Sequence, residues 1–262
     1  MAEAFTYDGY RELIRDYTGA GYRFGAFRDA LPASALEGQP LVLMRHDIDF
    51  DLGKARAMAE VEREEGILAT YFFLLRTDHY NLFSKPGSAE VERILQMGHR
   101  LGLHFDCAAY SPDATESELA AACRKEADAL GSWFGAEVEI VSYHRPNAQV
   151  LTGNPRLSAP RPHAYMARFM KDMKYCSDSR GEWRYGDPRS QPEFHARKAM
   201  QILIHPLWWG AGRRGAEETL ARWLDGQTEA LEDSMEANCA VYRKRAIPSR
   251  AQRAPRQGAE AK

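Results

Sequence analysis

Cysteine is scarce in this chain, and the few cysteines present lie far apart. Four occur among the 262 residues, at positions 107, 123, 176 and 239, and no two have CxxC spacing. This distribution argues against a disulfide framework and against a thiolate zinc site. The first residues also lack the basic segment and the apolar core of an export signal. We therefore expect free thiols and a cytoplasmic protein.

The chain also has no large excess of positive or negative charge. Lys and Arg number 35 against 37 Asp and Glu, which gives a formal net charge of −2. A near-neutral chain has no electrostatic signature of nucleic-acid binding, so we expect no nucleic-acid partner. No window approaches the roughly 18 apolar residues of a membrane-spanning helix, so no transmembrane segment is expected. The segment 248–262 is predicted to be a disordered basic tail.

The most informative stretch is 41–51, in which four apolar residues lead into acidic ones. The apolar run predicts a strand buried on both faces, as in a parallel sheet. Asp47 and Asp49 are two residues apart and so share one side of the strand. Because adjacent carboxylates repel, a divalent metal held by one, with the other free as a base, would relieve them. The alternative is an Asp-rich loop that caps a helix starting near Leu52.

Predicted strands and helices alternate along the chain. Besides 41–51, strands are expected at 67–75, 99–106, 138–143, 174–179 and 200–206, and the main helices at 7–19, 52–65, 88–97, 115–134 and 216–243. Strand, helix, strand is the right-handed crossover unit of parallel sheets. With no internal repeat and no linker, residues 1–247 are expected to form one barrel-like α/β domain.

Nearly every predicted strand ends in ionisable side chains. They are Asp47, Asp49, His104, Asp106, His144, Arg145, Asp178 and His205. Parallel strands bring these ends together at one edge of the sheet, which predicts a shared site. Oxygen and imidazole ligands in combination suit zinc and similar divalent metals.

In order and content, these motifs resemble the polysaccharide deacetylases of the NodB-homology type, which are similar to carbohydrate esterase family 4. The resemblance covers 41–209 and rests on Asp47 with Asp49, Gly98 to His104, Arg145-Pro146, loosely Ser177 to Trp183, and Leu203 to His205. It implies a distorted, incomplete (β/α) barrel. It also implies a metal-dependent hydrolase that removes an N-acetyl group from an amino sugar or saccharide, in surface-polysaccharide biosynthesis.

The resemblance also implies roles for individual residues. Asp47 would be the base and His205 the acid, Arg145 would orient Asp47, and Asp49 and His104 would hold the metal, expected to be Zn²⁺. The implied partner is an N-acetylated sugar that is nucleotide-linked, lipid-linked or part of an oligosaccharide. The alternatives are hydrolysis of another small amide or imide, and an inactive carbohydrate-binding member.

The second motif departs from the family at position 108, where Ala replaces a second metal-binding histidine. A catalytic zinc usually has three protein ligands. His144 is the favoured replacement, Asp106 is the competitor, and water or another group is the remaining option.

Five residues are candidates for sugar contacts. They are Tyr80, Asn81, Asp178, Trp183 and Trp208. For Trp208 and the adjacent Trp209, packing against the last helix is the alternative.

Overall fold

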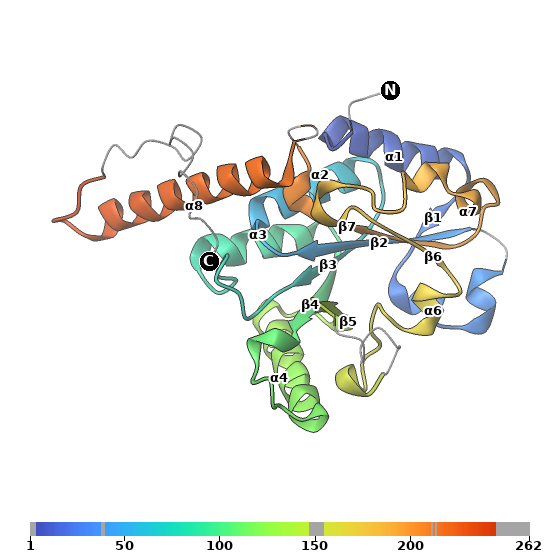
Figure 1. Cartoon of the computed structure of the whole chain (residues 1–262), viewed down its shortest axis with the longest axis horizontal. Coiled ribbons are helices and arrows are strands. Elements are labelled where there is room, and N and C mark those ends of the chain that lie inside the picture. Colours follow the sequence, from blue (N-terminus) through green and yellow to red (C-terminus); the bar gives the residue numbers. More distant parts are fainter. Residues whose placement is uncertain (1–3, 38–39, 147–154, 211, 213, 245–262) are drawn as a thin grey trace, which may run out of the picture. The chain divides into compact units, whose positions relative to one another are not determined.

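Seven parallel strands form one sheet in this computed structural model. The strands are β1 (Arg23–Phe24), β2 (Leu41–Ile48), β3 (Thr70–Phe73), β4 (Arg100–Asp106), β5 (Val138–His144), β6 (Lys174–Ser177) and β7 (Met200–Ile204). Their order is β5-β4-β3-β2-β7-β6, and β1 pairs with β2. Figure 1 shows the strands running through the middle of this part of the chain. The predicted α/β class is therefore confirmed, with an open parallel sheet.

The structure describes residues 4–37, 40–146, 155–210, 212 and 214–244. The chain divides into two compact units, Met1–Arg213 and Arg214–Lys262. The first contains the sheet, and the second contains the helix α8 (Ala216–Asn238). A single domain over 1–247 stays a prediction, and the tail 248–262 lies outside the described residues. Among the described helices, none is long and apolar enough to cross a membrane.

The described part of the first unit contains six α-helices, several of which start or end at recognisable signals. They are α1 (Tyr7–Gly19), α2 (Leu52–Glu64), α3 (Lys85–Gln96), α4 (Glu116–Phe134), and the short α6 (Ala167–Met170) and α7 (Pro192–His195). Thr115 and Glu118 form the predicted capping box of α4, and Gly135 ends that helix with a φ of 60°. The expected start of α3 at Ser88 is wrong, because Ser84 is the N-cap and Pro86 occupies the first turn.

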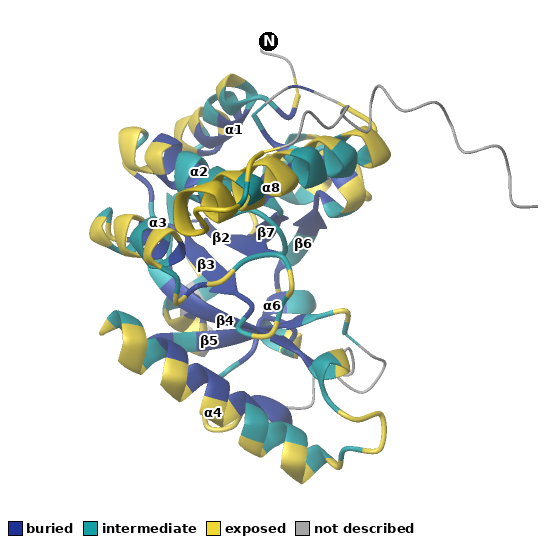
Figure 2. Ribbon diagram, turned by 90° about the vertical axis from the view of Figure 1, so that its left-hand side faces the viewer, coloured by how far each residue is buried: buried dark blue, intermediate teal, exposed yellow. Residues whose placement is uncertain are grey.

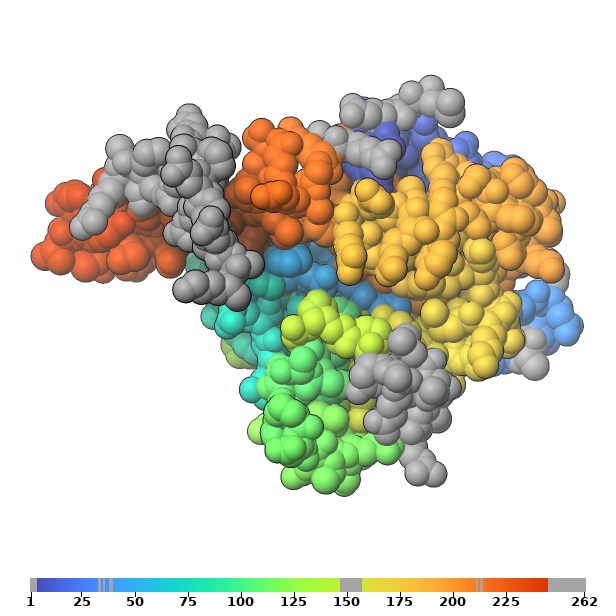
Figure 3. Space-filling view, viewed as in Figure 1, coloured from blue at the N-terminus to red at the C-terminus, as the bar shows by residue number. Residues whose placement is uncertain are grey.

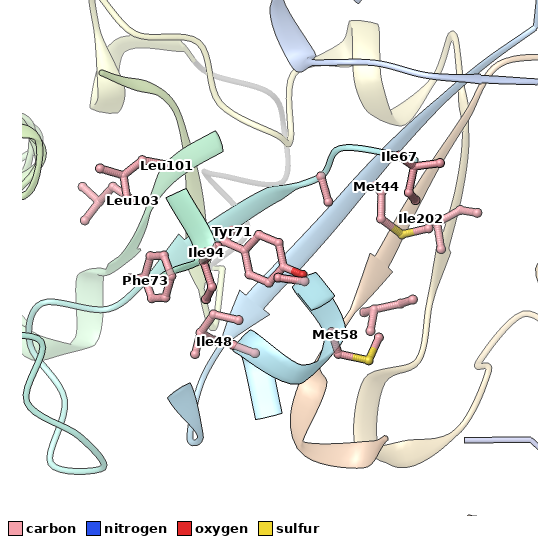
Figure 4. Packing of buried hydrophobic residues seen from close by; sticks show 14 of the residues in the cluster. Met44, Ile48, Met58, Ile67, Tyr71, Phe73, Ile94, Leu101, Leu103 and Ile202 are labelled. Carbon is pink, nitrogen blue, oxygen red and sulfur yellow. The ribbon is translucent and has the colours of Figure 1, made fainter. Parts of the chain in front are cut away.

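The core lies between the sheet and the helices that cover it. In Figure 2 the strands are buried while the helices expose their outer faces. Figure 4 shows strand residues such as Tyr71 and Leu103 packed with Met58 of α2 and Ile94 of α3. All of these side chains are buried. The continuous apolar runs of the sequence are therefore explained by burial of both sheet faces.

Strand β2 is buried along its whole length, including its polar residues. Arg45 and Asp47 share one side, and His46 points to the other. On that other side, Glu62 of α2 accepts hydrogen bonds from Tyr10 at 2.5 Å and Tyr71 at 2.7 Å, and lies 2.6 Å from His46 Nε2. These bonds thus connect the helix layer to the side of β2 on which His46 lies.

The segment 155–210 packs beside the N-terminal residues. The Tyr22 hydroxyl lies 3.0 to 3.2 Å from the backbone carbonyl oxygens of Glu193, Phe194 and Lys198, any one of which can accept its proton. Figure 3 shows the yellow and orange residues of this segment directly beside the blue N-terminal ones. Within this segment β7 pairs with β2, and β6 pairs with β7. The last strand ends therefore lie at the same edge of the sheet as the first.

Gly102 allows β3 and β4 to pair closely, and its replacement should destabilise the sheet. A Cβ at this position would lie 2.5 to 2.9 Å from ring atoms of the buried Phe72 on β3. We expect Gly102→Ala to lower the free energy of unfolding by about 1–3 kcal/mol, measured by urea denaturation. Gly19→Ala is the control, because a Cβ there meets nothing within 4 Å. An equal loss in both variants would contradict this role for Gly102.

Candidate metal centre

Three side chains from three strand ends converge on one point. Asp49 follows β2, and His104 and His144 lie at the ends of β4 and β5. Asp49 Oδ1 is 3.2 Å from His104 Nε2 and 3.3 Å from His144 Nδ1, and the two histidine nitrogens are 3.1 Å apart. These atoms form a nearly equilateral triangle of possible metal ligands. Asp106, the competing third ligand, is not part of it.

The triangle fits a first-row divalent metal. A tetrahedral ion with bonds of about 2.0 Å separates its ligand atoms by about 3.3 Å, close to the three distances seen here. Asp49 Oδ1 is buried and has no hydrogen-bond partner among the described residues. A buried carboxylate oxygen without a partner is costly unless a cation satisfies it. Both the donor set and the geometry therefore fit such a metal.

Ser142 on β5 orients two residues of this site. Its hydroxyl lies 2.6 Å from His104 Nδ1, which leaves Nε2 of that ring directed at Asp49. The same hydroxyl lies 3.3 Å from Asp47 Oδ1. A partner on the second ring nitrogen is the usual way in which a metal-binding histidine is oriented. Ser142 is not among the predicted site residues, although its position two residues before His144 puts both on one face of β5.

Asp47 is held by Arg45 of its own strand. Arg45 Nε donates to Asp47 Oδ1 at 2.9 Å, and Nη2 donates to Oδ2 at 2.7 Å. Burial disfavours the carboxylate, yet Arg45, followed by His104, lowers the pKa of Asp47 below its usual value. The guanidinium also lies 4.9 Å from the ring of Tyr165 and 5.5 Å from that of Phe72. Asp47 is thus kept ionised beside the triad, as a base must be.

The expectation that Arg145 orients Asp47 is wrong in this structure. Arg145 Nη2 donates to Asp106 Oδ2, and Asp106 Oδ1 accepts from the backbone of Ala108 at 3.0 Å. Arg145 has a φ of 50°, a left-handed conformation that is uncommon for a residue with a side chain. The chain turns there, directly after His144, and the guanidinium goes to the end of β4. Arg45, which sequence reasoning missed, precedes Asp47 by two residues and so reaches it on the same face.

His205 stands on the other side of the site and is held by Asp178. Its Nδ1 is 2.7 Å from Asp178 Oδ1, and its Nε2 is 4.0 Å from Asp49 Oδ2. Burial alone would lower the pKa of His205, but the hydrogen bond and charge of Asp178 raise it to about 9. Trp209 Nε1 donates to the second oxygen of Asp178 at 2.8 Å. His205 therefore carries a proton at neutral pH, with Nε2 directed at the triad.

Asp178 was expected to contact a sugar, and the structure corrects this. Its side chain is fully buried, and both oxygens are bonded to His205 and Trp209. A carboxylate in this position supports the acid instead of meeting a ligand. Trp209 packs on Phe5 at 5.0 Å and on Tyr10 of α1 at 5.3 Å. It is therefore a packing residue whose partners lie in the N-terminal segment, whereas the last helix was the expected partner.

The remaining predicted sugar contacts differ in their placement. Trp208 lines a pocket together with Asp47, Asp49 and His205. Trp183 is half-buried and packs on Trp209 at 6.1 Å. Asn81 is exposed, and its Oδ1 accepts from the backbone of Phe83 at 3.0 Å in the turn before α3. The Tyr80 hydroxyl is bonded to backbone atoms. Of these residues, Trp208 has the placement closest to that predicted for a substrate contact.

Comparisons with known proteins give likenesses of fold. No family model and no curated protein match the chain. Similar solved structures include the Streptococcus pyogenes deacetylase PplD in complex with acetate, at 12% identity, 79% coverage of this chain, 87% of that chain and a TM-score of 0.46. A family 4 carbohydrate esterase from Bacillus anthracis is 14% identical, with 87% and 93% coverage and a TM-score of 0.43.

A carbohydrate esterase family 4 pseudoenzyme from Bacillus anthracis is also similar, at 12% identity, 74% coverage of this chain, 60% of that chain and a TM-score of 0.41. At these identities and scores, the likeness transfers no activity to this chain.

The third ligand can be tested by metal binding. We expect His144→Ala to weaken zinc affinity by more than the roughly 10- to 100-fold that follows loss of an outer-shell partner, because it removes one corner of the triangle. Competition with a chromophoric chelator measures this affinity. The exposed His195 provides the control His195→Ala. Wild-type affinity in His144→Ala would remove His144 from the ligand set.

The effect of substitutions on stability can show whether Arg45 or Arg145 is the partner of Asp47. Arg45→Gln leaves the buried Asp47 without its counter-charge, and we expect it to lower the free energy of unfolding by about 3–5 kcal/mol. Arg145 is largely exposed, at 62% for its side chain. Arg145→Gln should therefore lower the free energy of unfolding by at most about 1 kcal/mol. Urea denaturation of the metal-free proteins gives both values, and the reverse order would restore Arg145 as the partner of Asp47.

Proposed function

We propose that this chain is a zinc-dependent amide hydrolase that removes the acetyl group from an N-acetylated amino sugar or saccharide. The observation that carries the proposal is the convergence of Asp49, His104 and His144, with Asp47 and His205 beside them. Asp47 is placed to accept a proton, and His205 is placed to donate one. Hydrolysis of an unactivated amide by this route requires a metal site, a general base and a general acid.

Asp49, His104 and His144 would hold the metal. When bound, a divalent cation there supplies Lewis acidity, which polarises an amide carbonyl and favours attack by water. Zinc is proposed because one carboxylate and two imidazoles form a typical ligand set for it. Ser142 keeps His104 in the orientation that this requires.

Asp47 would act as the general base. It takes a proton from the attacking water, and its carboxylate is available because Arg45 keeps it ionised. The bidentate bond to Arg45 also fixes the plane of the carboxylate. A base that is both charged and immobile has little to reorganise when the proton moves.

His205 would act as the general acid. Its Nδ1 is engaged by Asp178, so the proton that it can give is the one on Nε2, on the side of the triad. An amine is too poor a leaving group to depart unprotonated, and His205 donates to the nitrogen as the C–N bond breaks. In the site without metal, the hydrogen bond and charge of Asp178 raise the pKa of His205 to about 9, which favours the protonated form at neutral pH.

The proposed substrate is a sugar carried on a nucleotide, a lipid or an oligosaccharide, used in surface-polysaccharide biosynthesis. Trp208 lines the pocket beside the triad and offers an apolar surface for a sugar ring. The four cysteines are free, which agrees with the proposed cytoplasmic setting.

Acetate release tests the proposal directly. We expect zinc-loaded protein to release acetate from N-acetylhexosamine conjugates, and Asp47→Asn and His205→Ala each to lower kcat by about 100- to 10,000-fold while zinc stays bound. An enzymatic acetate assay, together with elemental analysis, measures both quantities. The control is the same protein after chelation of the metal.

Three outcomes would contradict the proposal. Sugar binding without acetate release would make the chain a binding module. Acetate release from small amides or imides alone would change the substrate class. Normal turnover in both variants would show that the assigned base and acid are wrong.

A further inference from the structure

The loop that follows β3 reaches back to the end of β2. Backbone pairing between these strands ends at Ile48 and Phe73. Just beyond this pair, the Tyr80 hydroxyl donates to the carbonyl oxygen of Ile48 at 2.6 Å and accepts from the backbone of Leu74 at 2.9 Å. Burial raises the pKa of Tyr80, so the hydroxyl keeps its proton. A side chain thus links the two strands at the point where their ladder stops.

His79 contacts the next two residues of the same strand end. Its Nδ1 lies 2.8 Å from the carbonyl oxygen of Asp49, which can only accept, so Nδ1 is the donor. Its ring stacks on Phe50 at 4.4 Å, with an interplanar angle of 22°. Three consecutive residues, Ile48, Asp49 and Phe50, are therefore held by two consecutive residues of one loop.

This arrangement fixes the backbone around Asp49, which the strand ladder does not reach. Asp49 lies one residue past the end of β2, where the strand ladder no longer fixes the backbone. Its carboxylate must nevertheless stay within about 0.5 Å of a productive position for metal binding. Bonds to the carbonyls on either side of its Cα restrict the rotation that would move the carboxylate away. Of the three triad residues, Asp49 is the one that stands outside a strand.

We propose that His79 and Tyr80 are positioning residues that hold Asp49 in place for metal binding. The proposal rests on the proposed function only in taking Asp49 as a metal ligand. It also changes the role of Tyr80, for which a sugar contact was expected. A hydroxyl with both a backbone donor and a backbone acceptor is already engaged.

Metal affinity of four variants tests this proposal. Tyr80→Phe removes one hydroxyl, and His79→Ala removes the donor to Asp49. We expect each to weaken zinc binding by about 10- to 100-fold, the range for groups that support a ligand. His79→Asn keeps a side-chain N–H close to the position of Nδ1, and it should restore affinity to within about threefold of wild type.

Tyr22→Phe is the matched control. The Tyr22 hydroxyl is also buried against backbone carbonyls, but those belong to the segment 193–198, away from the triad. We expect Tyr22→Phe to lower thermal stability as Tyr80→Phe does, with no change in zinc affinity. The visible absorption bands of the cobalt-substituted proteins provide a second readout. They should change in Tyr80→Phe and His79→Ala and remain unchanged in Tyr22→Phe.

Wild-type zinc affinity and cobalt spectra in Tyr80→Phe and His79→Ala would overturn the proposal and leave these residues with a purely structural role. If Tyr80→Phe fails to fold, the half-buried His79 and its Ala and Asn variants decide the question. Normal zinc binding without acetate release in wild-type protein would overturn the proposed function alone. Unchanged zinc affinity in the variants of an active enzyme would overturn the positioning role alone.

Discussion

Arg45 and Asp47 are both buried, and neither charge could remain there without the other. A lone buried ion is strongly destabilising, whereas a bidentate pair with further partners is tolerated. Arg45 finds those partners in Tyr165 at 3.2 Å and Gln201 at 3.4 Å. The Ser142 hydroxyl of β5 also donates to Asp47 Oδ1 at 3.3 Å. The pair is neutral as a whole, and within it Arg45 keeps the carboxylate of Asp47 ionised beside His104 of the triad.

Two functional side chains, His104 and His205, are each supported by a residue from a neighbouring strand or from the loop that follows it. His104 depends on Ser142 of β5, and His205 depends on Asp178, which follows β6. Such partners fix the rotamers of the groups that they touch, so the site is preorganised before any ligand binds. The supporting bonds run between neighbouring strands of the parallel sheet. Loss of sheet pairing would therefore disturb the chemistry as well as the stability.

Much of this arrangement could be read from local sequence patterns. Continuous apolar runs predicted the buried strands, and the Thr115–Glu118 capping box predicted the start of α4. The rule that parallel strands place their carboxyl ends at one edge predicted that eight strand-end residues, with Asp49, His104 and His144 among them, share a site. The strands and the cap could be predicted because burial and hydrogen bonding within a short segment decide them. The start of α3 was missed because two serines, at 84 and 88, compete for the same cap.

The sequence by itself determined the strands, their polar ends and the edge of the sheet at which those ends lie. Tertiary structure alone decided which of two arginines holds Asp47, which carboxylate supports His205, and that Tyr80 contacts the backbone. The physical reason is that these choices depend on side-chain reach and on the space between strands. Ser142 contacts both His104 and Asp47, and Arg145, in a left-handed conformation, bonds to Asp106, and no local pattern encodes these contacts. Partners distant in the chain are chosen by packing.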